Sequence, residues 1–516
     1  MNSESDVWAD PRAAKTFPQL IRAAAAAYGD DLAIRLTGET IPDESASFNE
    51  LDRKSAEIAR GLVACGIGKG ARVGFIYGNS PSFAIMLAAI ARIGAIAIPI
   101  STMIRANELV RVLRQSDVSG VIVQRRFLNT DYVERLCEAL PELRESGPDL
   151  RIARTPYLRW LVSTGDGLPA SFGDLGALVA GGAPVGEDLL REIEAEVHPT
   201  DQMVEIYTSG SMALPKGVRH SHGPVLFRTH YLRGMIGQER GREYGASLPM
   251  FWVGGLMMYL LPGWETGAVT LCTERTMSNS RIAMGSTLAD EDLAMLAQQK
   301  PPFWGLGMSE TLGPYSYGDE VRAPGRPVCS PMDHFADGYE IRIADENDQQ
   351  VADGEIGEMQ VRGYPLASGL HKVEQSAYYT PDGYYHTGDM CLIDGSRVHF
   401  IGRNGDMIKT AGSNVAPAEV EMEMQALEGI HNAYVVGLPD RERGQLLVAA
   451  VVPRDGNATL DFGAIEAMLR QRLSGYKVPR AYVQIAREEV PLLHSNKVSR
   501  RLITEMMAER LGRPAA

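Results

Sequence analysis

The first quarter of the chain alternates strand-like and helix-like segments, and this alternation constrains the fold more than any other feature of the sequence. Ser47 and Glu50 have the spacing of a capping box and open a helix that ends at Gly66. A second helix begins at Phe83. Short apolar runs typical of buried strands lie at 73–77, 95–98 and 121–123. Alternating strands and helices pack as layers with largely parallel strands, so the sequence predicts an α/β fold.

A second region with its own pattern begins near residue 404. Pro417 is suited to the first position of a helix. Strand-like and helix-like segments then follow at 433–438, 446–452, 461–473 and 481–485. The join at Gly402–Asp406 has two glycines among polar residues, a composition typical of a hinge. We therefore expect a large N-terminal domain of layered mixed sheets with helices, residues 1–403, and a small mobile α+β domain, residues 404–516.

Composition excludes several classes of protein. The formal net charge of −14 over 516 residues disfavours nonspecific nucleic-acid binding, which needs a basic surface. The five cysteines lack metal-ligand spacing, which fits reduced thiols. The longest apolar stretch, 83–100, is broken by Arg92, Gly94 and Pro99, whereas a membrane span needs about 20 uninterrupted apolar residues. We expect a cytoplasmic protein without a membrane span, and we expect residues 140–200, rich in proline, glycine and charge, to form a surface excursion.

One loop, Tyr207–Val218, concentrates groups that bind anions. It contains hydroxyls, glycines and one lysine, namely Thr208, Ser209, Gly210, Ser211, Lys216 and Gly217. Glycines let backbone N–H groups converge on an anion, hydroxyls donate to phosphate oxygens, and a lysine adds a compact charge. A Walker-type loop fits worse, because no Ser or Thr follows Lys216 directly. Taken alone, the loop is also compatible with an ordinary surface turn.

Four later motifs carry polar groups suited to a nucleotide. Gly307–Glu310 presents a hydroxyl and a carboxylate, and Glu310 could hold a magnesium ion, which prefers hard oxygen ligands. Asp389 follows a tight turn and is suited to accept hydrogen bonds from a ribose diol. Arg403 supplies a fixed cation with a fork of donors, and Lys497 lies in a polar loop. Each motif alone is equally compatible with a capped turn or a solvated charge.

In their order, these motifs resemble the adenylate-forming superfamily, which includes acyl-CoA synthetases, peptide-synthetase adenylation domains and luciferases, and specifically its AMP-forming acyl-CoA synthetases. The likeness covers nearly the whole chain. The matching segments are 47–51, 79–80, 94–99, 207–218, 307–310, 385–389, 402–409, 415–420, 437–440 and Lys497. No single motif decides the matter, but the ordered set is highly specific.

The resemblance implies roles for individual residues. The residues implied for ATP or AMP binding are Thr208, Ser209, Gly210, Ser211, Lys216, Gly307, Met308, Ser309, Asp389 and Arg403. Glu310 and Thr208 would hold magnesium, and both are implied as catalytic together with Lys497, which would bridge the substrate carboxylate and the α-phosphate. Ala411 and Gly412 would line a channel for CoA. Gly405 would be the hinge, and Trp252 and Gly254 would belong to the acyl pocket.

The activity implied is that of an AMP-forming acid–thiol ligase, a carboxylate–CoA ligase that requires ATP, Mg²⁺ and CoA. It would convert a hydrophobic fatty or aryl acid to an acyl-adenylate and then to a CoA thioester, as in fatty acid metabolism. The apolar run Met250–Leu261 is the basis for expecting a hydrophobic acid, although such runs are also typical of core. Partners would be small molecules, and a homodimer is compatible with this class.

The chain departs from the family pattern at several positions. The departures are Met212 and Ala213 in place of Thr and Gly, Leu306 in place of an aromatic, Trp252 in place of His, and Gly405 in place of Asp or Lys. The segment between Trp252 and Glu310 spans only 58 positions (310 − 252), several dozen fewer than is usual. A Gly-Gly-Ala-Pro run at 181–184 lies upstream of the phosphate loop and is treated as coincidental.

Three alternatives stay open at this point. An adenylating enzyme could pass the acyl group to a carrier protein, or oxidise it as luciferases do, instead of using CoA. The short 252–310 segment motivates a non-catalytic, nucleotide-binding member of the fold. A metal site at His220 and His222 is a further option, although no third ligand lies nearby in the sequence.

Overall fold

The computed structural model describes residues 10–208, 215–274, 304–318, 334–395, 397–410, 413–415, 417–441, 443–456, 458–473, 475, 477–492 and 498–514. Its α-helices are α1 (Phe17–Tyr28), α2 (Phe48–Ala64), α3 (Pro81–Ala91), α4 (Ala106–Gln115), α5 (Tyr132–Ala139), α6 (Leu175–Gly181), α7 (Glu187–Ala195), α8 (His222–Ile236), α9 (Val253–Gly255), α10 (Leu261–Thr266), α12 (Pro417–Gln425), α13 (Phe462–Arg472) and α14 (Arg500–Arg510). Among these helices, none combines the length and apolar character that a membrane crossing requires.

An eight-stranded sheet forms the centre of the N-terminal part, in the order β19-β11-β10-β4-β3-β5-β8-β9. Its strands are β3 (Arg72–Ile76), β4 (Ile96–Pro99), β5 (Gly120–Val123), β8 (Trp160–Ser163), β9 (Phe172–Asp174), β10 (Gln202–Thr208), β11 (Lys216–Ser221) and β19 (Gly369–Leu370). The pairs from β10 through β4, β3, β5 and β8 to β9 are parallel, while β11 is antiparallel to both of its neighbours. The predicted α/β layering with largely parallel strands is confirmed.

The predicted surface excursion at 140–200 is wrong for part of that range. Residues 160–163 and 172–174 are strands of the central sheet, and the side chains of Leu161 and Val162 are only 2% and 6% exposed. Strand β8 is buried, and the edge strand β9 buries Phe172, so the average composition of the region hid two short strands of the central sheet.

Local sequence signals set the ends of α2 as predicted. The Ser47 hydroxyl accepts from the backbone N–H of Glu50 at 3.2 Å, and the Glu50 carboxylate accepts from the N–H of Ser47 at 3.0 Å. The helix ends beside Gly66, whose φ of 77° lies in the region that glycine tolerates best. The apolar run that follows is the buried helix α3 and strand β4.

Three further sheets extend from this centre. They comprise β12-β13-β1-β2, with β1 (Leu32–Thr37), β2 (Glu44–Ser47), β12 (Glu243–Gly245) and β13 (Val269–Thr273); β14-β15-β16, with β14 (Trp304–Met308), β15 (Gly313–Gly318) and β16 (His334–Phe335); and β17-β18-β20-β21, with β17 (Tyr339–Ala344), β18 (Ile356–Gly363), β20 (Tyr385–Asp394) and β21 (Arg397–Arg403). A small hairpin joins β6 (Arg126–Phe127) to β7 (Thr130–Asp131).

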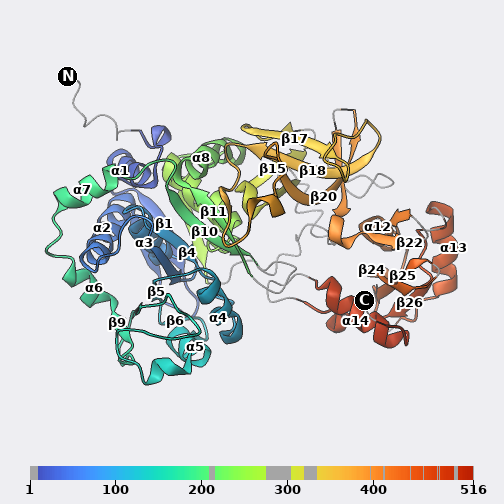
Figure 1. Cartoon of the computed structure of the whole chain (residues 1–516), viewed down its shortest axis with the longest axis horizontal. Coiled ribbons are helices and arrows are strands. Elements are labelled where there is room, and N and C mark those ends of the chain that lie inside the picture. The colour runs from blue at the N-terminus through green and yellow to red at the C-terminus, as the bar shows by residue number, and fades with distance from the viewer. Residues whose placement is uncertain are drawn as a thin grey trace.

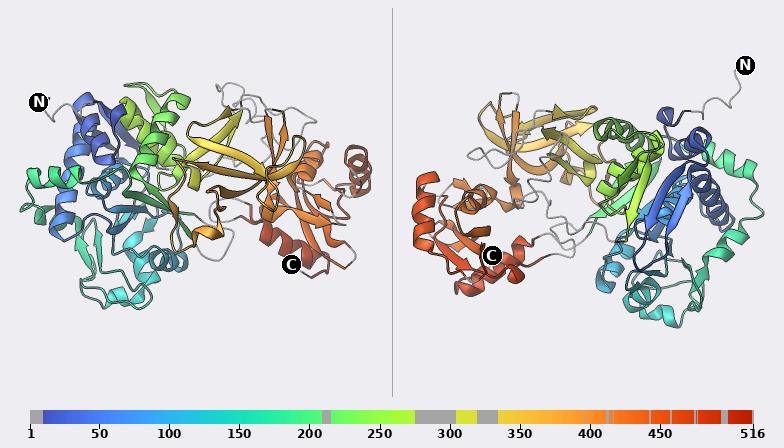
Figure 2. Two further views of the ribbon diagram at one scale, coloured as in Figure 1. Left: turned by 45° about the horizontal axis from the view of Figure 1, so that its top comes forward. Right: turned by 180° about the vertical axis from the view of Figure 1, so that it is seen from behind.

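The C-terminal region has a sheet of its own in the order β23-β22-β25-β24, with β26 paired to β25. Its strands are β22 (Ile408–Thr410), β23 (Ser413–Val415), β24 (Ile430–Asp440), β25 (Gly444–Pro453) and β26 (Ala481–Gln484). In Figure 1 these strands and helices α12–α14 gather at one end of the molecule, and β15, β17, β18 and β20 lie between them and the N-terminal layers. Both views in Figure 2 keep this order. A large N-terminal domain with a smaller α+β domain is thus confirmed, whereas the boundary after Arg403 stays a prediction.

Candidate active site

The structure describes eleven of the seventeen predicted site residues. Described with their side chains are Lys216, Met308, Ser309, Glu310, Asp389, Arg403, Trp252 and the glycines Gly254, Gly307 and Gly405; Thr208 is described as backbone only. Outside the described residues lie Ser209, Gly210, Ser211, Met212, Ala213, Ala411, Gly412 and Lys497, together with 275–303 of the short segment. We call the loop Tyr207–Val218 the phosphate loop. The site is built from the strand ends around this loop and from the described residues that meet there.

The phosphate loop joins the antiparallel strands β10 and β11, whose last register pair is Thr208 with Lys216. The base of this hairpin is closely packed and polar. A Cβ on Gly217 would lie 2.4 Å from Oε1 of Glu205, which is fully buried and accepts a 2.5 Å hydrogen bond from the Tyr207 hydroxyl. The other Glu205 oxygen pairs with Arg72. Glycine is thus required beside Lys216 by close approach, and the hairpin rests on a buried ion pair.

The motif at 307–310 forms a tight turn between β14 and β15. The turn is the short helix η5 (Ser309–Thr311), and Leu312 and Gly313 after it have positive φ of 50° and 99°. The Thr311 hydroxyl donates to the Gly313 carbonyl at 2.8 Å, which closes the turn. Leu306 is 2% exposed and packs in a core cluster with Tyr315.

Glu310 is held at three points by residues distant in sequence. His220 Nε2 donates to the Ser309 carbonyl at 2.8 Å. The Ala367 N–H donates to the Glu310 carbonyl at 2.8 Å, and the Tyr385 hydroxyl donates to Glu310 Oε1 at 2.9 Å. Burial raises the pKa of the Tyr385 hydroxyl, which keeps it a donor at neutral pH. Strands β11 and β20 thereby meet at the Glu310 turn: His220 of β11 holds its backbone, and Tyr385 of β20 holds the carboxylate.

Asp389 and Arg403 face each other across β20 and β21. They are register partners, and Arg403 Nε lies 2.7 Å from Asp389 Oδ1. The Tyr315 hydroxyl donates to Oδ2 at 3.3 Å. Asp389 is fully buried, and burial raises its pKa to about 6 despite the opposing effect of Arg403. Oδ1 is in ion-pair contact but accepts no hydrogen bond from the described part of the chain, so it retains capacity for an incoming hydroxyl.

The histidines at 220 and 222 are not a metal site. His222 Nδ1 accepts a 3.1 Å hydrogen bond from the Phe17 N–H, and His220 bonds the Ser309 carbonyl. Burial lowers the pKa of His220 to about 4 and that of His222 to about 3, so both rings are neutral at physiological pH. Within the described ranges, no three His, Cys, Asp or Glu side chains are grouped to hold a metal ion.

The predicted acyl-pocket residues lie on an anchored segment. The Asn79 amide donates to the Leu248 carbonyl at 2.8 Å and accepts from the Met250 N–H at 2.7 Å. Trp252 precedes α9 and packs edge-on against Phe251, with ring centroids 5.7 Å apart. A Cβ on Gly254 would meet the Leu248 side chain at 2.7 Å. Their role in holding an acyl group remains a prediction.

The predicted hinge residue has open space around it. Gly405 lies in the short helix η7 (Asn404–Asp406) between β21 and β22, is exposed, and would carry a Cβ without contact within 4 Å. The C-terminal end of this helix reaches the small domain, since Asp406 lies 3.7 Å from Arg500 of α14. Its hinge role remains a prediction.

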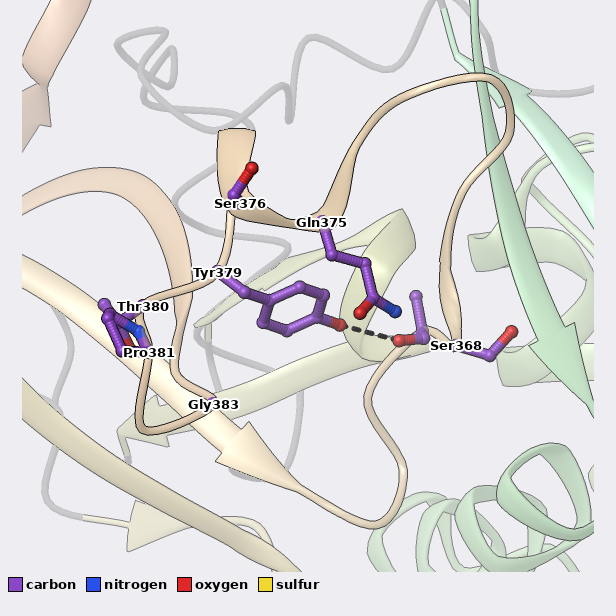
Figure 3. A pocket seen from close by; sticks show the side chains of 8 residues that line it. Ser368, Gln375, Ser376, Tyr379, Thr380, Pro381 and Gly383 are labelled. Carbon is purple, nitrogen blue, oxygen red and sulfur yellow. Dashed lines mark hydrogen bonds between the residues drawn. The ribbon is translucent and has the colours of Figure 1, made fainter.

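A separate hollow of about 620 Å³ is lined in part by Ala367, whose N–H bonds the Glu310 carbonyl, and by Tyr379 (Figure 3). Its lining is neutral and comprises Ala367, Ser368, Gln375, Ser376, Tyr379, Thr380, Pro381 and Gly383. The Tyr379 hydroxyl donates to the Ala367 carbonyl at 2.7 Å, which closes one side. None of the predicted site residues lines this hollow.

Sequence reasoning missed the roles of two residues that shape the site, Tyr385 and His220, the second of which it had considered only as a metal ligand. Tyr385 opens the motif of which only Asp389 was singled out, and the alternating burial of β20 places both on the same face. Because side chains two positions apart in a strand share a face, the positions before Asp389 on its face are 387 and 385, which would have identified Tyr385. His220 carried no usable signal, because its partner Ser309 is 89 positions away.

We expect Gly307→Ala to destabilise the protein by about 1–3 kcal/mol, because overpacking against fixed atoms forces the backbone to shift. A Cβ at this position would lie 2.5 Å from the carbonyl oxygen of Gly313, which is backbone and cannot change rotamer. Urea unfolding measures the effect. Gly234→Ala within α8, where a Cβ meets nothing within 4 Å, is the matched control and should not destabilise. Equal midpoints for the two variants would contradict the expectation.

Comparison with family models gives two matches. The model described as AMP-binding enzyme matches residues 21–285, and the model described as AMP-binding enzyme C-terminal domain matches residues 419–497.

Among curated proteins, the chain is 28% identical to a feruloyl-CoA synthase of Amycolatopsis sp., over 84% of this chain and 89% of that protein. It is 25% identical to an indoleacetate–CoA ligase of Aromatoleum aromaticum, over 92% and 96%. It is 24% identical to a mitochondrial medium-chain acyl-CoA ligase of Rattus norvegicus, over 96% and 88%.

Solved structures share the fold over nearly the whole chain. An anthranilate CoA ligase in complex with anthranoyl-AMP superposes with a TM-score of 0.76 at 19% identity, covering 96% of this chain and 98% of that one. ATP-bound MatB from Rhodopseudomonas palustris gives a TM-score of 0.69 at 19% identity, covering 96% and 99%.

Proposed function

Because the chain belongs to the AMP-binding enzyme family, we propose that it is an AMP-forming carboxylate–CoA ligase whose substrate is a hydrophobic aryl or fatty acid. The observation that carries the proposal is the convergence of a phosphate-loop hairpin, the Glu310 turn and the ion pair between buried Asp389 and exposed Arg403. Relatives named for feruloyl, indoleacetate and medium-chain acyl substrates support a hydrophobic acid. ATP and CoA are substrates of this reaction.

In the first step, a carboxylate oxygen attacks the α-phosphorus of ATP and pyrophosphate leaves. The two reactants are both anions, so the site must offset their repulsion. Lys216 and the loop before it hold the leaving phosphates, and Lys497 bridges the acid and the α-phosphate. Asp389 Oδ1 accepts from the ribose diol, and Arg403 keeps the Asp389 carboxylate ionised and oriented. In the second step, the CoA thiolate attacks the acyl carbonyl and AMP leaves.

The carboxylate of Glu310 fits a magnesium ion delivered with ATP. Magnesium is commonly held by one or two carboxylates together with substrate phosphates, and Glu310 supplies one partly exposed carboxylate. Thr208, at the end of β10, is the second proposed ligand. When bound, the ion supplies charge neutralisation of the phosphates. Tyr385 occupies only Oε1 of the carboxylate with its hydrogen bond.

Adenylate formation needs Lys497 at the acyl carboxylate, whereas thioester formation needs the CoA thiolate there. The small domain must therefore change its orientation between the two steps. We place the joint at Gly405, where neither side-chain contact nor burial opposes rotation. Ala411 and Gly412 follow it and would leave a narrow path for the thiol arm. A CoA acceptor is favoured over a carrier protein by these small residues.

Nucleoside affinity should fall as the pH falls through about 6, because Asp389 then gains a proton and loses acceptor strength. We expect about tenfold weaker binding at pH 5 than at pH 7.5. Adenosine, which has the ribose diol but no phosphate, is the probe for calorimetry. Asp389→Asn should bind weakly at both pH values, and a parallel pH dependence in that variant would contradict the assignment. Folding stability has the opposite sign: the folded state binds this proton more tightly, so the contribution of Asp389 decreases as pH rises from about 4 to about 6.

A panel of aryl and fatty acids, scored for ATP- and CoA-dependent thioester and AMP formation, tests the proposed function. Thioester formation with at least one hydrophobic acid is the expected result. AMP release that requires a holo carrier protein instead of CoA would favour the acyl-AMP ligase. Silence in pyrophosphate exchange across the whole panel would favour a non-catalytic nucleotide-binding protein, and would refute the proposal.

A further inference from the structure

The turn that carries Glu310 is held by hydrogen bonds to its backbone and to its side chain. Its backbone is fixed before and after the side chain, by the His220 ring at the Ser309 carbonyl and by the Ala367 N–H at the Glu310 carbonyl. Both hydrogen bonds are 2.8 Å long. With the backbone held, the remaining freedom is the rotation of the Glu310 side chain itself.

The Tyr385 hydroxyl acts on that remaining freedom. It donates to Oε1 of Glu310 at 2.9 Å from a ring that is only 6% exposed. A buried donor of this kind selects one carboxylate oxygen and one rotamer. Within the described part of the chain no hydrogen bond engages the other oxygen, Oε2, which is therefore available to a ligand of the opposite charge.

The Tyr385 ring is held in place independently of its hydroxyl. It packs against Tyr378 and Tyr379, with centroid distances of 5.8 and 5.5 Å. The ring therefore keeps its position when the hydroxyl is removed. Tyr385→Phe is for this reason a clean test of the hydrogen bond alone.

We propose that Tyr385 is a positioning residue, which orients the Glu310 carboxylate so that Oε2 meets the divalent cation of the metal–ATP substrate. The inference rests on the proposed function, since it concerns how that substrate is recognised. It predicts that Tyr385 matters for metal-bound nucleotide and not for nucleotide alone. A purely structural tyrosine would affect both equally.

Binding of a non-hydrolysable ATP analogue, measured by calorimetry with Mg²⁺ and with EDTA, tests the proposal. In the wild type we expect Mg²⁺ to strengthen binding. Tyr385→Phe should reduce this enhancement roughly tenfold, as for loss of one hydrogen bond to a charged group, and leave binding in EDTA unchanged. Tyr379→Phe is the matched control, because it removes a hydroxyl from the same ring cluster whose acceptor is the Ala367 carbonyl and not Glu310. Its Mg²⁺ enhancement should equal that of the wild type.

A double-mutant cycle with Glu310→Gln isolates the interaction. In the Glu310→Gln background, Tyr385→Phe should have no further effect on the Mg²⁺ enhancement. The proposal is overturned if Tyr385→Phe keeps the wild-type enhancement, if Tyr379→Phe loses as much, or if the two changes are additive. Those outcomes leave the proposed function intact, whereas a wild-type protein that binds no nucleotide under either condition would refute both.

Discussion

Lys497→Ala should lower the rate of acyl-adenylate formation about 10²–10³-fold, the usual effect of removing one preorganised charge from a transition state. The proposed role is to bring the acid to the anionic α-phosphate, so the loss should appear in kcat of pyrophosphate exchange. Thioester formation from a preformed acyl-adenylate should be retained, because the CoA step does not need that bridge. Pyrophosphate exchange and single-turnover thioester assays measure the two steps separately.

The small domain offers a matched control for this change. Arg501→Ala also removes one positive charge from the same segment, but its side chain is 72% exposed and pairs with Glu505 on α14. Arg500, between the two positions, is anchored by paired hydrogen bonds to Glu421 at 2.8 and 2.9 Å, so the start of α14 should keep its place in both variants. Equal adenylation rates in the two variants would remove the special role of Lys497.

Asp389→Ala should weaken ATP binding about 100-fold, as expected for two hydrogen bonds from a ribose diol to a buried carboxylate at about 1.5 kcal/mol each. The substitution also leaves the buried Tyr315 hydroxyl without its 3.3 Å acceptor, so some stability is lost as well. Calorimetric ATP binding and urea unfolding separate the two consequences.

The nucleotide itself supplies the sharper control. An ATP analogue lacking both ribose hydroxyls should bind the wild type and Asp389→Ala with similar affinity, because it cannot use the carboxylate. Asp394→Ala, at the far end of the same strand with a side chain 76% exposed, should bind ATP like the wild type. If the ratio of the affinities for ATP and for the dideoxy analogue is the same in Asp389→Ala as in the wild type, Asp389 does not contact the ribose.

The local signals in this sequence were strong and were read correctly. The capping box at Ser47 and Glu50, the glycine stop at Gly66 and the first-turn Pro417 each act within a few residues, and each appears in the structure where predicted. The order of motifs from Tyr207 to Lys497 likewise sufficed to indicate the family, since it depends on residue types and spacing. Average composition was a poorer guide: it suggested a surface excursion where two short strands belong to the central sheet.

The arrangement of the site is a different matter, because its contacts join residues far apart along the chain. Tyr385 reaches Glu310 across 75 positions, His220 reaches Ser309 across 89, and Tyr315 reaches Asp389 across 74. No pattern of period 2 or 3.6 encodes such pairs, since they arise only when separate sheets pack together. Residue types and their spacing were enough to propose which carboxylates serve the nucleotide. Which hydroxyls orient those carboxylates, and which oxygen each leaves free, came from the packing of β11, η5, β15 and β20 around them.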